Sequence, residues 1–261
     1  MRLPGAGQRQ GQALRLHKTN MKANEASDKL AQLFMQHGAA SLDKQIYLEA
    51  MLGKARWSFA LDEGVLAFRL PHQEPLQLNV QLLGTESADD HSWMWAWNNT
   101  TSAIHLRLLK AAQDLRAFGE REDVPELCTP LLTLSSTING GRIAAVACGV
   151  ARAACFFRVA YPGGVLFMLI KDARYKRSVL HPLKRIAQVF PRFVAQHAVV
   201  DQRFAFISYL KFYRLKVEEH PRQARLPRPP HRHRSSSHAH RAVPFRYPSP
   251  RRPPRRRQAR Q

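Results

Sequence analysis

The chain of 261 residues is poor in cysteine and has no long apolar run. Its three cysteines, Cys128, Cys148 and Cys155, are odd in number and lie in apolar sequence, which favours buried reduced thiols over a disulfide framework. The longest apolar run, residues 143–157, contains Arg152 and is shorter than the roughly 20 residues that a membrane-spanning helix needs. The N-terminal residues show no signal-peptide pattern. We therefore expect a soluble, cytoplasmic protein without a membrane span.

Acidic residues are absent from both ends of the chain. Residues 1–22 contain five basic and no acidic side chains, and residues 220–261 contain thirteen Arg, nine Pro and five His but no Lys, Asp or Glu. The formal net charge of +22 therefore falls to +4 between residues 23 and 219, which hold 23 basic and 19 acidic side chains. The high overall charge gives no reason to assign nucleic-acid binding to the middle of the chain.

These shifts in composition predict three parts. A basic leader covers residues 1–20, a single domain covers residues 21–219, and a basic tail covers residues 220–261. A segment of about 200 residues is long enough for one substantial hydrophobic core. Met21 stands directly before the first amphipathic pattern, so we interpret the leader as an extension upstream of the true translation start. Both ends are expected to be disordered.

Two interpretations fit the tail. A segment rich in Arg, Pro, His and Ser but without Lys or acids is typical of GC-rich DNA read in a shifted frame, which makes the tail a frameshift product. A genuine tail would bind nucleic-acid phosphates with a strong dependence on salt. Its densest basic cluster would then supply the contacts: Arg251, Arg252, Arg255, Arg256 and Arg257.

Hydrophobic periodicity predicts an α+β domain. Helical spacing predicts a helical pair or one kinked helix over residues 23–52, with His37 and Gly38 at the break. Alternating apolar residues predict a four-strand meander and a later hairpin, with turns at residues 62–64 and 161–164. The predicted strands are residues 56–61, 65–70, 76–82, 92–97, 156–160 and 165–170, and the further helices are residues 102–118, 143–148 and 181–213, the last with a boundary or kink at Pro191. The expected fold is an antiparallel sheet of about six strands, covered by helices.

Three of the four tryptophans stand two positions apart in the fourth predicted strand, at Trp93, Trp95 and Trp97. This period places the indoles on one face, and the residues between them are apolar too, so we expect a strand inside the sheet with both faces covered. The indoles then belong to the core. Exposed indoles would instead form a stacking platform for a sugar, a base or a peptide side chain, with the neighbouring Asn98 as a hydrogen-bonding group. The ligand-binding hypothesis rests on these four residues.

The stretch from Met21 to Glu219 resembles a family of bacterial proteins known only as a domain of unknown function. The motifs that carry the resemblance are Asp43-Lys44-Gln45, the hairpin over residues 57–68, Leu82-Leu83-Gly84-Thr85, the signature Ser92-Trp93-Met94-Trp95-Ala96-Trp97-Asn98-Asn99, Ala117-Phe118-Gly119-Glu120, and the helix and hairpin over residues 144–170. Neither basic end looks like this family. The resemblance implies no reaction, cofactor or catalytic residue.

The sequence shows no local pattern of catalytic or metal-binding residues. Asp89-Asp90-His91 is too short a loop cluster to hold an ion without partners from elsewhere, and the histidines at 37, 105 and 197 lack the neighbours of a catalytic triad. Gly140-Gly141 lacks the rest of a phosphate-binding loop. We therefore expect neither a metal nor a cofactor.

The function that these observations favour is a non-catalytic binding or interaction module, with a protein or a small molecule as its partner. An enzyme whose residues are dispersed around the tryptophan strand is the first alternative. Nucleic-acid association through the arginine-rich tail is the second.

Overall fold

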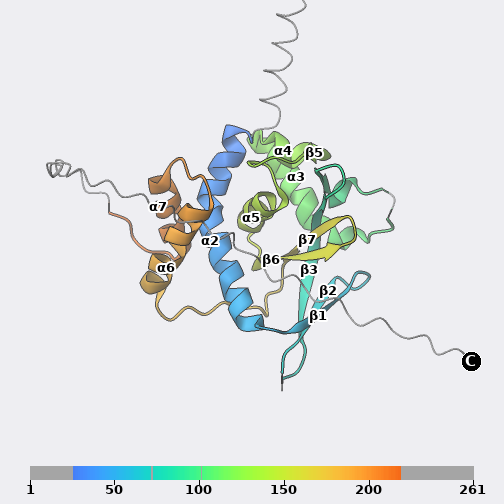
Figure 1. The fold of residues 1–261 in the computed structure, drawn as a ribbon, viewed down its shortest axis with the longest axis horizontal. Coiled ribbons are helices and arrows are strands. Elements are labelled where there is room, and N and C mark those ends of the chain that lie inside the picture. Colours follow the sequence, from blue (N-terminus) through green and yellow to red (C-terminus); the bar gives the residue numbers. More distant parts are fainter. Residues whose placement is uncertain (1–25, 72, 101, 219–261) are drawn as a thin grey trace, which may run out of the picture. The chain divides into compact units, whose positions relative to one another are not determined.

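The computed structural model describes residues 26–71, 73–100 and 102–218, which form an α+β fold of seven strands and six α-helices (Figure 1). The predicted fold class is confirmed. Both basic ends, and with them the predicted nucleic-acid contacts in the tail, lie outside the described residues. The domain boundaries at residues 21 and 219 accordingly stay predictions.

The first described helix, α2 (Asp28–Leu52), is a single helix of 25 residues. Its N-terminus is capped by Ser27, whose side chain accepts a hydrogen bond from the Leu30 amide at 3.1 Å. The predicted break at Gly38 is wrong because tertiary packing, not a turn, explains this glycine. A Cβ atom on Gly38 would lie 2.6 Å from the ring of Phe193, so the missing side chain lets another helix approach.

Four consecutive strands form the predicted meander: β1 (Arg56–Ala60), β2 (Val65–Arg69), β3 (Leu76–Ser87) and β4 (Ser92–Trp95). The turn between β1 and β2 ends at Gly64, which has φ +65°, a conformation that favours glycine. Leu66 and Phe68 on β2 and Leu78 on β3 are buried, while residues between them point outward. The period-two pattern of the sequence therefore reports one covered face of this sheet.

Strand β3 holds the sheet together because it pairs with three others. Its first part pairs with β2, and its second part lies between β4 and β7 (Gly164–Ile170). The hairpin of β6 (Cys155–Tyr161) and β7 turns at Gly163, with φ +89°, as predicted. A seventh, unpredicted strand, β5 (Leu131–Thr133), pairs with β4 at the edge. The resulting antiparallel sheet curls into a half-barrel.

The region after β4 departs from the prediction. The chain leaves the strand at Trp95 and makes one 3-10 turn, η1 (Ala96–Asn98), so Trp97 does not continue the strand. A second 3-10 turn, η2 (Leu106–Leu108), precedes α3 (Lys110–Glu122), which starts eight residues later than the predicted position 102. The short helix α4 (Pro125–Cys128) then leads to β5. The prediction of a period-two ladder of three indoles is therefore wrong at its third member.

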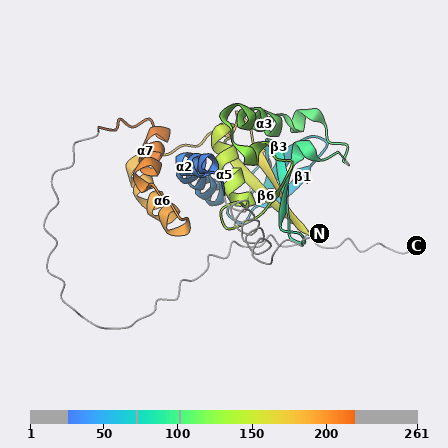
Figure 2. The same ribbon diagram turned by 90° about the horizontal axis from the view of Figure 1, so that it is seen from above.

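Helices pack on the sheet in layers. Helix α5 (Gly140–Val150) contains the helix predicted over residues 143–148, consists mainly of small residues and is capped by Asn139. Helix α6 (Pro182–Gln196) continues through Pro191, so a boundary there is wrong, whereas the alternative of a kink stays a prediction. Helix α7 (Gln202–Phe212) is capped by Asp201, whose side chain accepts a hydrogen bond from the Phe204 amide. Figure 2 shows α2 between the pair α6 and α7 on one side and α5 on the other. Helix α2 is thus the middle layer of these helices.

Candidate functional site

The tryptophan strand lies in the core. Trp93 and Trp95 are both 0% exposed, and their rings meet edge to face with centroids 5.4 Å apart. The indole N–H of Trp95 donates a hydrogen bond to the Glu126 carbonyl at 3.0 Å, whereas the indole nitrogen of Trp93 has no hydrogen-bond partner. The interpretation of these two indoles as core residues is confirmed.

Trp97 and Asn98 lie at the edge of this core and are partly exposed. The Trp97 ring stacks on Trp95 at an interplanar angle of 13° and a centroid distance of 6.5 Å. The guanidinium of Arg116 lies 4.7 Å from the Trp97 ring centroid, a cation–π arrangement. One protein side chain therefore already occupies the place that a stacked ligand would take on this indole.

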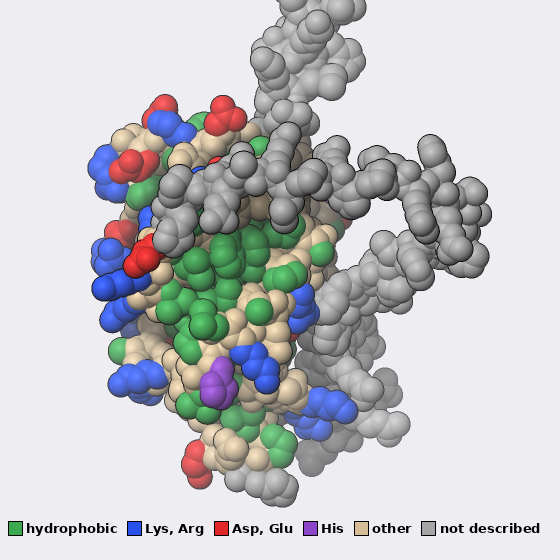
Figure 3. Space-filling model, turned by 90° about the vertical axis from the view of Figure 1, so that its left-hand side faces the viewer, with side chains coloured by type: hydrophobic (Ala, Val, Ile, Leu, Met, Phe, Trp, Pro, Cys, Tyr) green, Lys and Arg blue, Asp and Glu red, His purple; other side chains and the backbone are tan. Residues whose placement is uncertain are grey.

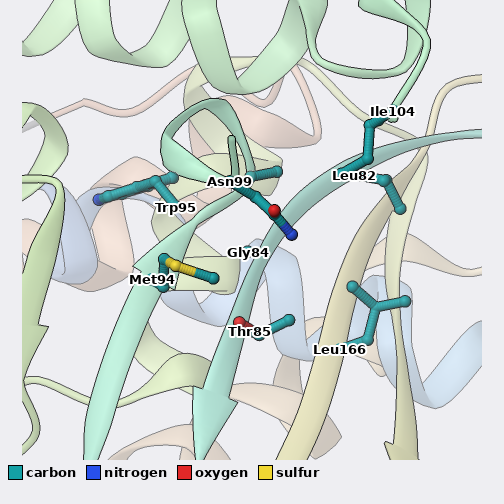
Figure 4. A pocket seen from close by; sticks show the side chains of 9 residues that line it. Leu82, Gly84, Thr85, Met94, Trp95, Asn99, Ile104 and Leu166 are labelled. Atoms are coloured by element: carbon teal, nitrogen blue, oxygen red, sulfur yellow. The ribbon is translucent and has the colours of Figure 1, made fainter. Parts of the chain in front are cut away.

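A small cavity adjoins the strand (Figure 4). Its wall consists of Leu82, Gly84, Thr85, Met94, Trp95, Ala96, Asn99, Ile104 and Leu166. Its volume of about 30 Å³ holds a water molecule but not a sugar or a base. The ligand-binding role of Trp93, Trp95, Trp97 and Asn98 stays a prediction, and it requires this region to open.

Two of the other polar groups considered in the sequence have structural partners. Asp90 accepts a hydrogen bond from the Ser92 hydroxyl at 2.7 Å, and His105 caps η2 by accepting from the Arg107 amide at 3.2 Å. Among the described residues no group of three or more His, Cys, Asp or Glu side chains is placed to hold a metal ion. No helix within the described part of the chain is long and apolar enough to cross a membrane.

Asp43 on α2 is the centre of a buried polar cluster, which we call the Asp43 clamp. Its carboxylate is 0% exposed and accepts four hydrogen bonds. The donors are Arg177 Nη1 at 2.8 Å, Arg185 Nε at 2.7 Å, the Tyr209 hydroxyl at 2.8 Å and the Tyr213 hydroxyl. They come from the loop after β7, from α6, from α7 and from the residue after α7. One side chain of α2 therefore fixes the whole C-terminal helical pair.

The charge balance of the clamp favours an ionised carboxylate. Burial raises the pKa of Asp43, but the hydrogen bonds from Tyr213 and Arg185 and the charge of Arg177 outweigh it and hold the pKa below its ordinary value. The same burial, with the neighbouring carboxylate, raises the pKa of Tyr209 far above its ordinary value. A carboxylate whose lone pairs are already taken by four donors is a poor proton acceptor, so the clamp suits docking better than catalysis.

Two neighbours of Asp43 extend the polar cluster toward α5 and β6. Lys44 donates a hydrogen bond to the Ala153 carbonyl at 2.7 Å, and Gln45 donates one to the Phe156 carbonyl at 2.7 Å. Both amine and amide also approach buried thiols, Cys148 and Cys155. Burial raises the pKa of both thiols, which keeps them protonated and unreactive.

The sequence motif Asp43-Lys44-Gln45 thus joins three layers of the fold, although periodicity gives it no role. The partners of Asp43 lie 134 to 170 residues away along the chain, beyond the reach of any local pattern. One signal was present. A charged residue follows the small and apolar run Gly38-Ala39-Ala40-Ser41-Leu42, where an acid is costly to bury unless cations cover it.

Exposed apolar side chains gather on the outer face of α6 and α7 (Figure 3). Leu183 is 69% exposed and Phe206 is 37% exposed. Phe190 and Phe206 connect the two helices, with ring centroids 4.8 Å apart. We call this surface the outer apolar patch: it comprises Leu183, Ala187, Phe190 and Val194 of α6 and Phe206 and Leu210 of α7. Lysine and arginine side chains lie along its edges (Figure 3).

His37 on α2 and His197 directly after α6 make the free energy of unfolding depend on pH. Burial, together with the charge of Lys44, lowers the pKa of His37 to about 4, and burial with Arg142 lowers that of His197 to about 4. The unfolded chain takes up protons near pH 6.5, so stability falls as the pH drops from 6.5 to 4. We expect a loss on the order of 1–2 kcal/mol per histidine, after allowance for solvent screening.

Urea unfolding at pH 7, 5.5 and 4.5 measures this dependence. Replacing both histidines by glutamine should make the free energy of unfolding nearly independent of pH between pH 6.5 and 4. Glu49 has the opposite effect, because burial raises its pKa and the folded state therefore gains stability as the pH falls. Replacing Glu49 by glutamine should make the loss of unfolding free energy at low pH slightly larger. A curve that stays steep without the histidines would contradict the assignment.

This fold and these contacts define a class of protein. It is an α+β domain in which Asp43 of α2 holds the helical pair α6 and α7. The sequence matches the Family of unknown function (DUF6882) over residues 31–173, more than half of the chain, and the protein belongs to this family. The resemblance stated from the motifs is confirmed. No curated protein and no solved structure matches the chain.

Proposed function

We propose that this protein is a non-catalytic binding module of the bacterial cytoplasm, and that the helical pair of α6 and α7 is its binding element. The observation that carries the proposal is the outer apolar patch. Of the eight large apolar side chains that are exposed among the described residues, Leu183 and Phe206 belong to this patch, and Leu180 and Val200 lie in the segments that flank α6. Apolar groups that gather on one face typically mark a contact site for another molecule.

The commitment of the buried polar groups supports a binding role over the enzyme alternative. Asp43, Lys44 and Gln45 all make structural hydrogen bonds that join separate elements. A catalytic group must instead keep a lone pair or a proton for the substrate. The apolar surroundings of Cys148 and Cys155, both 0% exposed, support the reducing cytoplasm as the location.

Site-specific photocrosslinking in the native cells tests the proposal. A benzophenone amino acid in place of Phe206 lies in the patch, and the same amino acid in place of Tyr161 provides a control. Phe206 and Tyr161 are both aromatic and are 37% and 44% exposed, but Tyr161 belongs to β6. We expect a discrete adduct at position 206 and none at position 161. No adduct at 206, or the same adducts at both positions, would refute the binding role of the helical pair.

A further inference from the structure

The outer apolar patch has the spacing of a helix-packing seam. Helix α6 carries two apolar stripes, of which the first, Ile186, Val189 and Phe193, is buried. The second stripe lies on the flank beside α7, which Phe190 contacts through Phe206. It is exposed at Leu183 and Ala187 and partly buried at its other two positions. That second stripe occupies positions 183, 187, 190 and 194, with steps of four, three and four residues. This is the spacing of the a and d positions that a second helix contacts. A helix with two apolar stripes is typical of an element that lies between two neighbours.

Small residues on this flank allow a close approach. Ala187, Pro191 and Ala195 are exposed and stand four residues apart on the same side of α6. Pro191 has no N–H, so the carbonyl of Ala187 receives no helical hydrogen bond from it.

The charge of this region is opposite to that of the rest of the domain. Residues 171–217 contain 11 basic and two acidic side chains, a net charge of +9, whereas residues 23–170 contain 12 basic and 15 acidic ones, a net charge of −3. Both acids of the basic region have structural roles, since Asp172 pairs with Arg174 and Asp201 caps α7. A molecule that covers the patch therefore meets a basic surface and needs acidic groups.

The two basic ends of the sequence lack the acidic groups that such a cover needs. Residues 1–22 and 220–261 contain basic but no acidic side chains, so they carry the same sign of charge as the patch edges. A second copy that presented the same face would also bring like charges together. A nucleic acid has the right sign, but the centre of the patch is apolar, where phosphates find no partner.

We propose that the outer apolar patch binds an amphipathic helix of a partner protein, with apolar residues at heptad spacing and acidic residues beside them. The apolar stripe of the partner covers Leu183, Ala187 and Val194 along α6, and Phe206 of α7 closes one side. The acidic flanks face Lys184 and the other basic residues of the pair. This inference rests on the proposed binding role of α6 and α7 and adds the class of partner.

Fluorescence anisotropy with the full chain and two designed peptides provides the test. Both peptides carry leucine at the a and d positions of three heptads; the first has glutamate at the e and g positions, and the second has lysine there. Like charges at e and g keep each peptide from pairing with itself. We expect saturable binding of the glutamate peptide that weakens as salt increases, with at least tenfold weaker binding of the lysine peptide.

Matched variants locate the binding site. Leu183→Glu should weaken binding of the glutamate peptide at least tenfold, because it places a like charge in the apolar seam. Leu106→Glu is the control, since Leu106 is 71% exposed and Leu183 is 69% exposed, and it should leave binding unchanged. Circular dichroism checks that both variants are folded. Equal binding of both peptides, or full binding by Leu183→Glu, would overturn the proposal.

Vesicles of phosphatidylglycerol and of phosphatidylcholine separate this partner class from a lipid surface. Retention on phosphatidylglycerol vesicles without binding of the glutamate peptide would overturn the helix proposal in favour of an anionic membrane. The crosslinking result separates the binding role of α6 and α7 from the class of partner that they bind. A patch-specific adduct without preference for the glutamate peptide refutes only the partner class, whereas the absence of any adduct refutes the binding role itself.

Discussion

Replacing Asp43 by alanine is expected to lower the free energy of unfolding by about 3–5 kcal/mol, the typical cost of removing one partner from a buried ion pair. The reason is that Arg177 and Arg185, whose side chains are only 16% and 22% exposed, lose the carboxylate between them. Two tyrosine hydroxyls lose their acceptor at the same time. Urea unfolding of the variant and of the parent protein measures the difference.

The clamp also predicts where the effect appears. Amide hydrogen exchange should rise in α6 and α7 more than in β3 and β7, because only the helical pair is held by these bonds. Tyr213→Phe is the matched control. It removes one of four donors, at an expected cost of about 1 kcal/mol. If Asp43→Ala cost no more than Tyr213→Phe, or if exchange rose equally in the sheet, the clamp would not be the attachment of the helical pair.

Replacing Trp93 by alanine should cost about 3–5 kcal/mol, the usual range for a fully buried Trp or Phe. The indole packs on Trp95 and on Phe167, with centroids 5.4 and 5.3 Å apart, and it lies against Gly84, where a Cβ atom would come within 2.5 Å of it. A rigid strand backbone on one side and two rings on the other cannot collapse into the space. The cavity therefore stays open.

Trp97→Ala is the control for this prediction, because Trp97 is the same residue type but is partly exposed and lies on the 3-10 turn. This substitution should lower the free energy of unfolding by less than half as much as Trp93→Ala does. Thermal and urea unfolding of both variants measure the comparison. Equal losses would mean that the two indoles are equally important to the core, contrary to their burial.

Local sequence patterns predicted those parts of the fold that local chemistry determines. Both hairpins were found because Gly64 and Gly163 have positive φ angles at turns that favour glycine. The apolar and small residues 143–148 likewise indicated a helix, which lies within α5. Each of these signals acts over a few residues, within the reach of a pattern.

Tertiary packing decided the remaining features. Gly38 looks like a helix break in the sequence, yet it accommodates the ring of Phe193, a residue 155 positions later. Trp97 continues a period of two in the sequence, but the chain turns after Trp95 and brings the third indole flat against the second. Strand β5 has only three residues, too few for a periodic signal.

The candidate site was the least predictable part. The sequence directed attention to the tryptophans because they are rare and regularly spaced, and two of them are core residues. No local sequence pattern marks Asp43 as a functional group, because its four hydrogen-bond donors are distant in the sequence. Helical periodicity indicates apolar residues on two sides of α6, but only the structure distinguishes the buried stripe from the stripe that is exposed at Leu183 and Ala187.

The distance of Asp43 from its partners has a consequence for synthesis of the chain. At about 5–20 residues per second, a separation of 134 to 170 residues corresponds to roughly 7–34 seconds of translation. During that time α2 has emerged but the helices that cover one side of it have not, so Phe34 and the neighbouring apolar residues lack their final contacts. Completion of α7 ends this interval, and until then this side of α2 is open to aggregation or to chaperone binding.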